Sequence, residues 1–532
     1  MNPFSPQSED HKWGVLIVVI IGSFMAILDA SIVNVALPKI MATFGATVEQ
    51  IEWVVTAYMI AFAIAMPTTT WFQERFSLKN VFIGSLGIFC LGSALCGLAW
   101  NEDSLIVFRV IQAFGGGAMM PTGLTLVSNA FPPQERGLAM GTWSIGAMVA
   151  PALGPFLGGY LVDEISWRSI FYINVPVGAV ATLAAVFILA TRKGSGIGRK
   201  FDFPGFVSFS VFLAALLIAL SQGQREGWDS DYILSCFVMS FLGLAIFLGS
   251  SFLRKDSIID LSLLTIHNFV MANIINFVRA IAIFGSMFLL PLYLQNILDY
   301  TALQTGIILA PTAISVAVVS PFSGMISDRI GPRIPLFLGT VLLVYSFYLY
   351  KDLSLKSDYW FLVFPQVVRG TGLGLINAPL MSTALNAVRR EQTGGASSLL
   401  TIIMQIGGAF GVALLGTTLQ RREFFHYAHY LGQIQDFFSS PVSQAYLAMQ
   451  NLLLQAGHEP AEVAVQGKML LSLWIHRHAA ASGFADSFVF TGLLMTLGII
   501  PALLIRNRKG PATAEPAGPG EGPGAAEARR GK

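Results

Sequence analysis

An aspartate and an arginine stand inside two long apolar runs of the chain. Asp29 lies in the stretch ILDASIVNVALP, which ends at Pro38, and Arg109 begins the stretch RVIQAFGGG. A charged side chain at the centre of a membrane span costs roughly 2.5–3.5 kcal/mol on insertion scales, so such residues normally have a partner and a function. Counted by helix rise, Asp29 lies ~13 Å and Arg109 ~9 Å from the same face of the membrane. We therefore expect the two side chains to pair.

The pair can be read in two ways. Arg109 favours the ionised carboxylate of Asp29, whereas burial favours the neutral acid. A carboxyl group balanced between these effects can accept a proton from one side of the membrane and release it on the other. We predict that Asp29 carries the proton and that Arg109 tunes it; the alternative is a permanent ion pair that only holds two helices together.

Further polar side chains in the apolar runs are candidates for a substrate cavity. Arg279 lies ~16 Å from the inner end of its run, and Asn276 precedes it by three residues, near the same face of a helix. A cavity role would favour anionic or neutral substrates over cations; the alternative is an arginine bonded to carbonyl groups of a broken helix. Arg369 is similar, although it also fits a helix-packing hydrogen bond. The predicted cavity residues are Asn34, Gln112, Asn276, Arg279, Arg369, Asn377 and Gln405.

The elements that must position these residues are membrane helices. The chain is 54% hydrophobic and 12% charged, whereas soluble domains carry about 25% charged residues. About 20 apolar residues span a bilayer as a helix. The sequence predicts an all-α membrane protein of fourteen spans, near 14–36, 51–72, 80–99, 104–128, 138–161, 169–191, 204–222, 232–253, 269–294, 303–326, 334–350, 359–386, 396–419 and 484–506.

Short motifs recur at a fixed spacing in the two halves of the chain. The loop GMISDRIGPR corresponds to TTWFQERFSLK at an offset of 254 residues, and QVVRGTGLG corresponds to RVIQAFGGG at an offset of 257 residues. Parallel repeats of six spans are a transporter architecture, with the ligand site at the midplane between the repeats. We predict two parallel six-helix bundles, over 14–191 and 269–506, with two inserted transmembrane helices at 204–253.

Lysine and arginine gather in alternate loops, which places both termini in the cytoplasm by the positive-inside rule. Residues 1–13 then form a cytoplasmic N-terminus. Residues 420–483 are too polar to span and are predicted as a long outer loop with an amphipathic stretch, AYLAMQNLLLQAG. The tail at 507–532 is rich in Gly, Pro, Ala and Glu and is predicted to be disordered.

Several of these motifs resemble one family. LDASIVNVALP, RVIQAFGGG, APALGPFLGG and WRSIFYINVPVG resemble motifs of helices one, four, five and six in the fourteen-span drug:proton antiporters of the major facilitator superfamily, the EmrB/QacA type. The resemblance runs from Trp13 to about Arg508. The segments RREFFHYAH and GFADSF, at the two ends of the long outer loop, are closer to the EmrB-type members. The expected fold is the major facilitator (MFS) fold.

The resemblance implies roles for two further sets of residues. The loops after spans two and ten are expected to gate the inner side, with an acid at the N-terminus of a neighbouring helix; plain positive-inside topology is the alternative. The small residues of span five let helices approach and bend. They are expected to seal the pathway against leak, with packing alone as the alternative. The gating residues are Glu74, Arg75, Lys79, Asp328, Arg329 and Arg333, and the antiporter-motif residues are Gly146, Pro151, Gly154, Pro155, Gly158 and Gly159.

These features together predict a proton-driven multidrug efflux antiporter that exports hydrophobic toxic compounds by alternating access. The energy source would be the proton gradient, without a cofactor, and the result would be antibiotic resistance. The resemblance implies the inner membrane of the cell and a tripartite system with a periplasmic adaptor protein and an outer-membrane channel. The alternatives are a proton-coupled or uncoupled permease for a specific metabolite or lipid, and a membrane scaffold or sensor.

Other classes of function find no support in the sequence. No G-x-x-x-x-G-K-[ST] loop occurs, so ATP-driven pumping is unsupported. No nucleophile–base arrangement suggests an enzyme. His426, His429, His476 and His478 have no metal-ligand spacing, so no metal site is expected. The net charge of +2 is too close to neutral to suggest nucleic acid as a partner.

Overall fold

The computed structural model describes residues 9–190, 201–253, 257–432 and 441–506, and it is built from helices. The predictions for the remaining residues, including the disordered tail at 507–532, lie outside the described part. The first helices are α1 (Glu9–Phe44), α2 (Val48–Arg75), α3 (Leu78–Gly97), α4 (Glu102–Ala130), α5 (Arg136–Glu164), α6 (Ser169–Tyr172) and α7 (Asn174–Ile188). There follow α8 (Phe203–Glu226), α9 (Asp231–Leu253), α10 (His267–Leu292), α11 (Ala302–Ile330), α12 (Arg333–Tyr348), α13 (Tyr359–Asn386), α14 (Thr393–Gly432), α15 (Pro441–Gln455), α16 (Pro460–Thr496) and α17 (Ile499–Leu504).

Twelve stretches of helix among the described residues are long and apolar enough to cross a membrane. A thirteenth is α5, if its two parts, which meet at an angle of 41° between Pro151 and Phe156, form one span. The run predicted at 359–386 forms α13, which is a helix of 28 residues but does not meet this criterion. A multi-pass membrane protein is therefore confirmed, and the count of fourteen spans is not.

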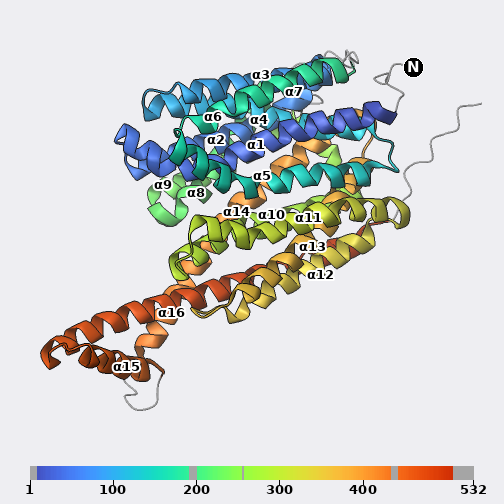
Figure 1. The fold of residues 1–532 in the computed structure, drawn as a ribbon. Helices are drawn as coiled ribbons and strands as arrows, with labels where there is room; N and C mark the ends of the chain where they lie inside the picture. The colour runs from blue at the N-terminus through green and yellow to red at the C-terminus, as the bar shows by residue number, and fades with distance from the viewer. Residues whose placement is uncertain (1–8, 191–200, 254–256, 433–440, 507–532) are drawn as a thin grey trace, which may run out of the picture.

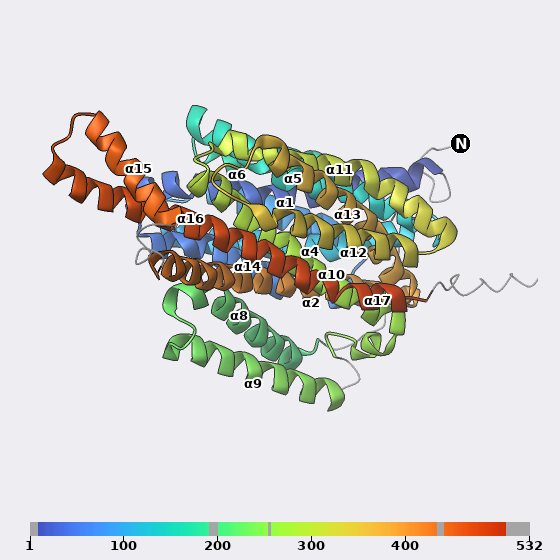
Figure 2. The same ribbon diagram turned by 90° about the horizontal axis from the view of Figure 1, so that it is seen from below.

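The helices form two groups with a smaller pair beside them (Figure 1). Helices α1 to α7 pack together as the first group, and α10 to α14 pack with α16 and α17 as the second. The pair α8 and α9 lies to one side (Figure 2). Helix α8 contacts both groups, since Arg225 pairs with Glu52 of α2 and Trp228, just after α8, donates from Nε1 to Thr417 Oγ1 of α14 over 3.1 Å.

The two ends of the described chain lie at the same end of the molecule (Figure 2). We call this the terminal end, and the opposite end, where α15 projects, the distal end. Helix starts repeat between the groups: α2 begins with a capping box of Thr47 and Gln50, and α11 begins with one of Thr301 and Gln304. Each box satisfies two otherwise unpaired N–H groups of a first turn.

The described part of 420–483, which the sequence predicts as an outer loop, is largely helical. Helix α14 continues to Gly432, and α16 begins at Pro460, well before the predicted span. Both helices extend beyond the rest of the molecule at the distal end, and α15 packs against α16 there (Figure 1). Val442, Leu471 and Ile475 form a small buried core in this projection. Polarity argues against a membrane span, but it does not prevent helix formation when an apolar stripe can be buried.

Candidate functional site

Asp29 and Arg109 form an ion pair inside the first helix group. Nη1 of Arg109, on α4, donates to Oδ2 of Asp29, on α1, over 2.5 Å. The side chains are 1% and 0% exposed, respectively. Removing either partner of a buried pair would leave an uncompensated charge, at a cost of roughly 3–5 kcal/mol. The contact therefore explains how an aspartate is tolerated in the middle of α1.

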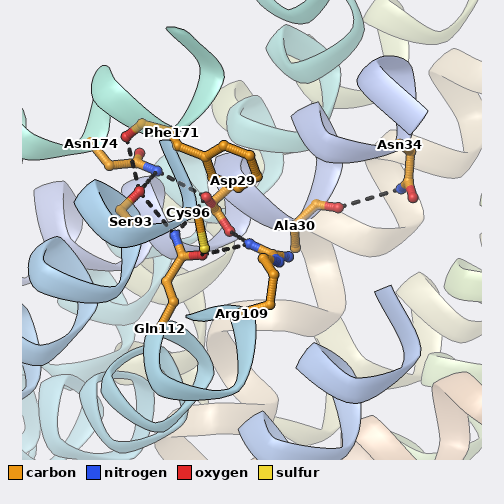
Figure 3. Close-up of polar contacts among 9 residues, drawn as sticks. All are labelled: Asp29, Ala30, Asn34, Ser93, Cys96, Arg109, Gln112, Phe171 and Asn174. Atoms are coloured by element: carbon orange, nitrogen blue, oxygen red, sulfur yellow. Dashed lines mark hydrogen bonds and ion pairs between the residues drawn. The ribbon is translucent and has the colours of Figure 1, made fainter. Parts of the chain in front are cut away.

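Two neutral amides complete the shell around the carboxylate (Figure 3). Nε2 of Gln112 and Nδ2 of Asn174 each donate to Oδ1 of Asp29 over 2.8 Å. Both amides also donate to Ser93 Oγ, over 3.1 and 3.0 Å. The carboxylate thus accepts hydrogen bonds from α4 and α7, and Ser93 of α3 joins the two amides.

Aromatic rings cover the guanidinium. The Cζ atom of Arg109 lies 3.8 Å from the ring centre of Tyr58 and 5.8 Å from that of Phe171. Rings at this distance attract a cation through their negative faces. Glycine at position 92 lets α3 approach, because a Cβ there would lie 2.5 Å from the backbone of Gln112.

The hydrogen bonds around Asp29 depend on the charge of its carboxyl group. All of the donors that reach Asp29 stabilise its ionised form, because a carboxylate only accepts hydrogen bonds. A proton on Asp29 would remove the charge that Arg109 is paired with and would turn one carboxylate oxygen into a donor facing other donors. Protonation therefore has to rearrange contacts between α1, α4 and α7.

The glycine- and proline-rich part of α5 packs against α1 directly after Asp29. Pro155 has no N–H group to donate to the carbonyl of Pro151, and Ser31 Oγ donates to that carbonyl instead, over 3.1 Å. A Cβ on Gly154 would lie 2.2 Å from Ser31 Oγ. The close contact between the two helices thus depends on both residue types.

The other glycines of this segment differ in their surroundings. A Cβ on Gly146 would lie 2.8 Å from Ile20, and a Cβ on Gly158 would lie 2.9 Å from Ile32, so both face α1. A Cβ on Gly159 would meet no atom within 4 Å. Only part of the predicted antiporter set therefore serves the contact with α1.

The second helix group contains a cluster around Arg279. Nη1 of Arg279 donates to Oδ1 of Asn377, and Nη2 donates to Oδ1 of Asn276 over 2.8 Å. Nη2 also contacts Met404 Sδ at 3.8 Å, and Asn276 donates from Nδ2 to the carbonyl of Leu400 over 2.8 Å. The cluster joins α10, α13 and α14 through neutral acceptors.

Arg369 belongs to a separate cluster on α13. Nη2 of Arg369 donates to Oε1 of Gln366, which also accepts from Thr312 Oγ1 over 2.6 Å. Nε2 of Gln366 donates to the hydroxyl of Tyr350. The bond between Arg369 and Gln366 lies within α13, and Arg369 reaches Thr312 Oγ1 of α11 over 3.5 Å. Gln366 makes the shorter contacts outside α13, to Thr312 and Tyr350.

The remaining predicted cavity residues lie apart from these clusters. Asn34 is exposed, and its Nδ2 donates to the carbonyl of Ala30 on its own helix over 3.3 Å, away from Asp29 (Figure 3). Gln405 is half-buried on α14, next to Met404. Gln112, also predicted for the cavity, lies instead in the shell around Asp29.

The two helix groups are held together at the terminal end by Asp328. Its carboxylate oxygens accept from the backbone N–H groups of Gly137 and Leu138, over 3.0 and 3.1 Å, in the first turn of α5. An anion is favourable at this position because it meets unpaired N–H groups and the positive end of the helix dipole. The helices cross closely here: a Cβ on Gly324 would lie 2.0 Å from the carbonyl oxygen of Gly137.

In the first repeat, the neutral side chain of Gln73, which precedes the counterpart of Asp328 by one residue, lies beside the first turn of α14. A Cβ on Gly394, in the first turn of α14, would lie 2.4 Å from Oε1 of Gln73, and Gln73 donates to Thr122 Oγ1 over 3.1 Å. Lys79 donates to the carbonyl of Val186 within its own group, over 2.6 Å. Of the other predicted gating residues, Glu74 is half-buried, and Arg75, Arg329 and Arg333 are exposed.

Hydroxyl groups add to the contact between the two groups. Thr69 and Ser398 are 2.8 Å apart at their oxygen atoms, and Thr125 and Ser397 are 2.7 Å apart. All four lie toward the terminal ends of α2, α4 and α14. The structure therefore has its two helix groups joined at the terminal end.

Several residues of the Asp29 cluster were not predicted as its members. Gln112 and Asn174 lie within the motifs RVIQAFGGG and WRSIFYINVPVG, so the motifs contain the signal although the spacing does not assign the contact. Ser93 and Tyr58 lie in ordinary apolar runs, where a single hydroxyl gives no signal.

Comparisons with known proteins agree with the fold. A family model described as Major Facilitator Superfamily matches residues 19–412. The multidrug export protein EmrB of Haemophilus influenzae is 30% identical over 434 residues, which cover 81% of this chain and 84% of that protein. The fatty acid resistance protein FarB of Neisseria gonorrhoeae is 30% identical over 431 residues, with 81% and 85% covered.

A solved structure has the same fold. The crystal structure of the human organic anion transporter MFSD10 matches with a TM-score of 0.59 and 14% identity, and the match covers 93% of this chain and 99% of that one. The likeness to EmrB-type proteins that the motifs indicate is confirmed by the relatives above. On its fold, its motifs and the family model, the chain belongs to the major facilitator superfamily.

Proposed function

We propose that the protein is a proton-driven antiporter that exports hydrophobic toxic compounds by alternating access. The observation that carries the proposal is the buried carboxylate of Asp29, held by Arg109, Gln112 and Asn174. An acidic group at this depth that is tied to three helices can link its protonation to their arrangement. Among the described residues of the second group, no acidic side chain is as deeply buried as Asp29, so Asp29 is the carrier we propose.

The coupling follows from the contacts of the two charge states. Ionised Asp29 holds Arg109 and the two amides, which fixes α1, α4 and α7 relative to one another. Protonated Asp29 releases Arg109 from its counterion, and the buried guanidinium then needs new acceptors or water. Because α5 packs on α1 at Ser31, two residues from Asp29, a shift of α1 is passed to α5, whose first turn binds Asp328.

The proposed orientation places the terminal end in the cytoplasm, as the distribution of Lys and Arg favours. The two groups are joined there, so this conformation would be closed to the cytoplasm and would receive a proton from outside. The proposal includes fourteen spans, with α13 crossing beside α11 and α12, against which it packs. Polar side chains in its middle lower its hydropathy, and they face other helices instead of lipid.

The cargo and partners are proposed by analogy with relatives. Proteins named for multidrug export and for fatty acid resistance share about 30% of their residues with this chain, which supports hydrophobic small molecules as cargo. The projection of α14, α15 and α16 extends the molecule at the distal end, where a periplasmic adaptor protein would meet it. An outer-membrane channel would complete the path from the inner membrane.

Proton coupling is tested in everted membrane vesicles with an imposed proton gradient. Adding a hydrophobic compound that the protein exports should dissipate the gradient, and Asp29→Asn should abolish this response because the amide cannot carry a proton. The matched control is Asp103→Asn, which changes an exposed carboxylate in the first turn of α4. Full coupled export by the Asp29→Asn protein would remove Asp29 from the mechanism.

The adaptor is tested by removing the projection. A Cβ on Gly483 would lie 3.0 Å from the backbone nitrogen of Glu423, so α14 and α16 are adjacent there and a short glycine linker can replace 425–481. The shortened protein should retain transport in vesicles and lose resistance in whole cells. Unchanged resistance in cells would argue against a partner at this projection.

A further inference from the structure

Two arginines of the second helix group are buried without an acidic partner in the described part of the chain. Arg279 is 2% exposed and Arg369 is 6% exposed. The ion pairs formed between described residues include neither of them. Arg109, the buried arginine of the first group, is paired with Asp29. Buried charges are normally paired, so the second group has an excess of positive charge to be explained.

The two repeats use the same pair of side chains in reverse order. Gln366 and Arg369 of α13 stand at the positions that correspond to Arg109 and Gln112 of α4. In each repeat the arginine donates to Oε1 of the glutamine. In the first repeat the glutamine Nε2 donates to Asp29, and in the second it donates to the hydroxyl of Tyr350. The acid has no counterpart in the second repeat, so charge compensation there must come from elsewhere.

The side chains of Arg279 and Asn377 each have one hydrogen-bond donor that their described neighbours do not use. Its acceptors are the amide oxygens of Asn276 and Asn377 and the sulfur of Met404. Nε of Arg279 and Nδ2 of Asn377 are buried and have no hydrogen-bond partner among the residues that the structure describes. A buried donor without a partner destabilises the fold. These two donors belong to side chains that touch each other, and an anion with two oxygens can accept from both.

We propose that Arg279 and Asn377 form a binding site for the acidic group of an amphipathic monoanion, such as an aliphatic or aromatic carboxylate. The thioether of Met404, which contacts the guanidinium, offers a soft apolar surface to the rest of the molecule. The transported proton and the anion would thus be bound by different helix groups. The role in export rests on the proposed function, but binding of the anion does not depend on proton coupling.

The test uses three naphthalene probes that differ in charge. Binding of 1-naphthoate, neutral 1-naphthylmethanol and cationic 1-naphthylmethylammonium to the purified full chain is followed by probe fluorescence. The wild-type protein should bind the anion most tightly. Arg279→Gln should weaken naphthoate binding by roughly 10-fold to 150-fold, the range for a hydrogen bond to a charged group, and leave the neutral probe unchanged. Asn377→Ala should weaken naphthoate binding to a smaller extent.

Controls separate this site from folding and from proton coupling. Arg279→Lys keeps the charge and loses the fork of donors, so it should bind naphthoate with intermediate affinity. Asn273→Ala changes a buried amide of α10 that bonds only to its own helix at Phe269, and it should bind all three probes normally. Asp29→Asn should also bind naphthoate; if Asp29→Asn still couples export while Arg279→Gln loses the anion, only the proposed coupling fails. Equal affinity of the wild-type protein for the anionic and neutral probes, or unchanged binding by Arg279→Gln, would overturn the anion site.

Discussion

The crossing of α5 and α11 allows alternating access to be tested with a single methyl group. In Gly324→Ala the new Cβ would lie 2.0 Å from the carbonyl oxygen of Gly137 and 2.3 Å from its carbonyl carbon. Both atoms are backbone, so a change of rotamer cannot relieve the overlap and the helices have to separate. Separation also pulls Asp328 away from the first turn of α5.

The expected size of the effect follows from the cost of overpacking. An extra methyl group in a well-packed contact costs about 1–3 kcal/mol, which changes an equilibrium by a factor of about 5 to 150. The cost arises only in the conformation in which Gly324 meets Gly137. The substitution should therefore shift the population toward the conformation that is open at the terminal end.

The population is measured by labelling a cysteine in the same contact. Ser320 is 0% exposed on α11, one turn before Gly324, so Ser320→Cys should react slowly with a membrane-impermeant maleimide in everted vesicles. Adding Gly324→Ala should raise the labelling rate by about the factor above. Gly306→Ala, on the same helix with no atom within 4 Å of the new Cβ, should not. An unchanged rate in the Gly324→Ala protein would refute the assignment of this crossing as a gate.

Three further predictions concern the packing beside Asp29, the hydrogen bond from Asn174 and the charge that is moved during export. Gly154→Ala should lower the thermal unfolding temperature by a few degrees and reduce coupled export, because its Cβ would overlap Ser31 Oγ; Gly159→Ala should do neither, and equal effects would contradict the packing argument. Asn174→Leu should slow drug-dependent proton uptake about tenfold or more by removing a hydrogen bond to the charged Asp29, while an unchanged rate would exclude it from the cluster. Export of a monoanion against one proton moves two positive charges inward, which is worth about 4.6 kcal/mol per 100 mV. A potassium diffusion potential that is negative inside should therefore accelerate naphthoate export, and voltage-independent export would contradict this charge count.

The contact of Asp29 with Arg109 could be predicted because a membrane span has a known rise. Position along two such helices gives depth, and similar depth predicts the pair. Depth does not give rotation about the helix axis, so the sequence assigns Gln112 to a cavity when it faces Asp29. Asn174 could not be assigned because it depends on the break between α6 and α7, which the composition of that run does not show.

The fold was predictable to the extent that hydropathy determines it. The apolar runs give most of the spans and their order, and the repeated motifs indicate the two groups. The projection at 420–483 was predicted as a loop because its residues are too polar to face lipid. Its helices are stabilised by one another instead, through the buried cluster of Val442, Leu471 and Ile475, and pairing of this kind is not visible in a hydropathy scan.

The projection also transmits movement of the membrane-embedded part of α14 to the distal end of the molecule. Helix α14 is continuous over 40 residues, or roughly 60 Å at 1.5 Å per residue. If α14 tilts as a rigid body about its first turns, near Ser397 and Ser398, its distal end moves the furthest. A rigid-body tilt of about 15°, a size known from allosteric rotations, sweeps a point ~50 Å from the pivot through roughly 13 Å. A protein bound at the distal end of α14 would therefore be displaced once per transport cycle without contact with the cargo.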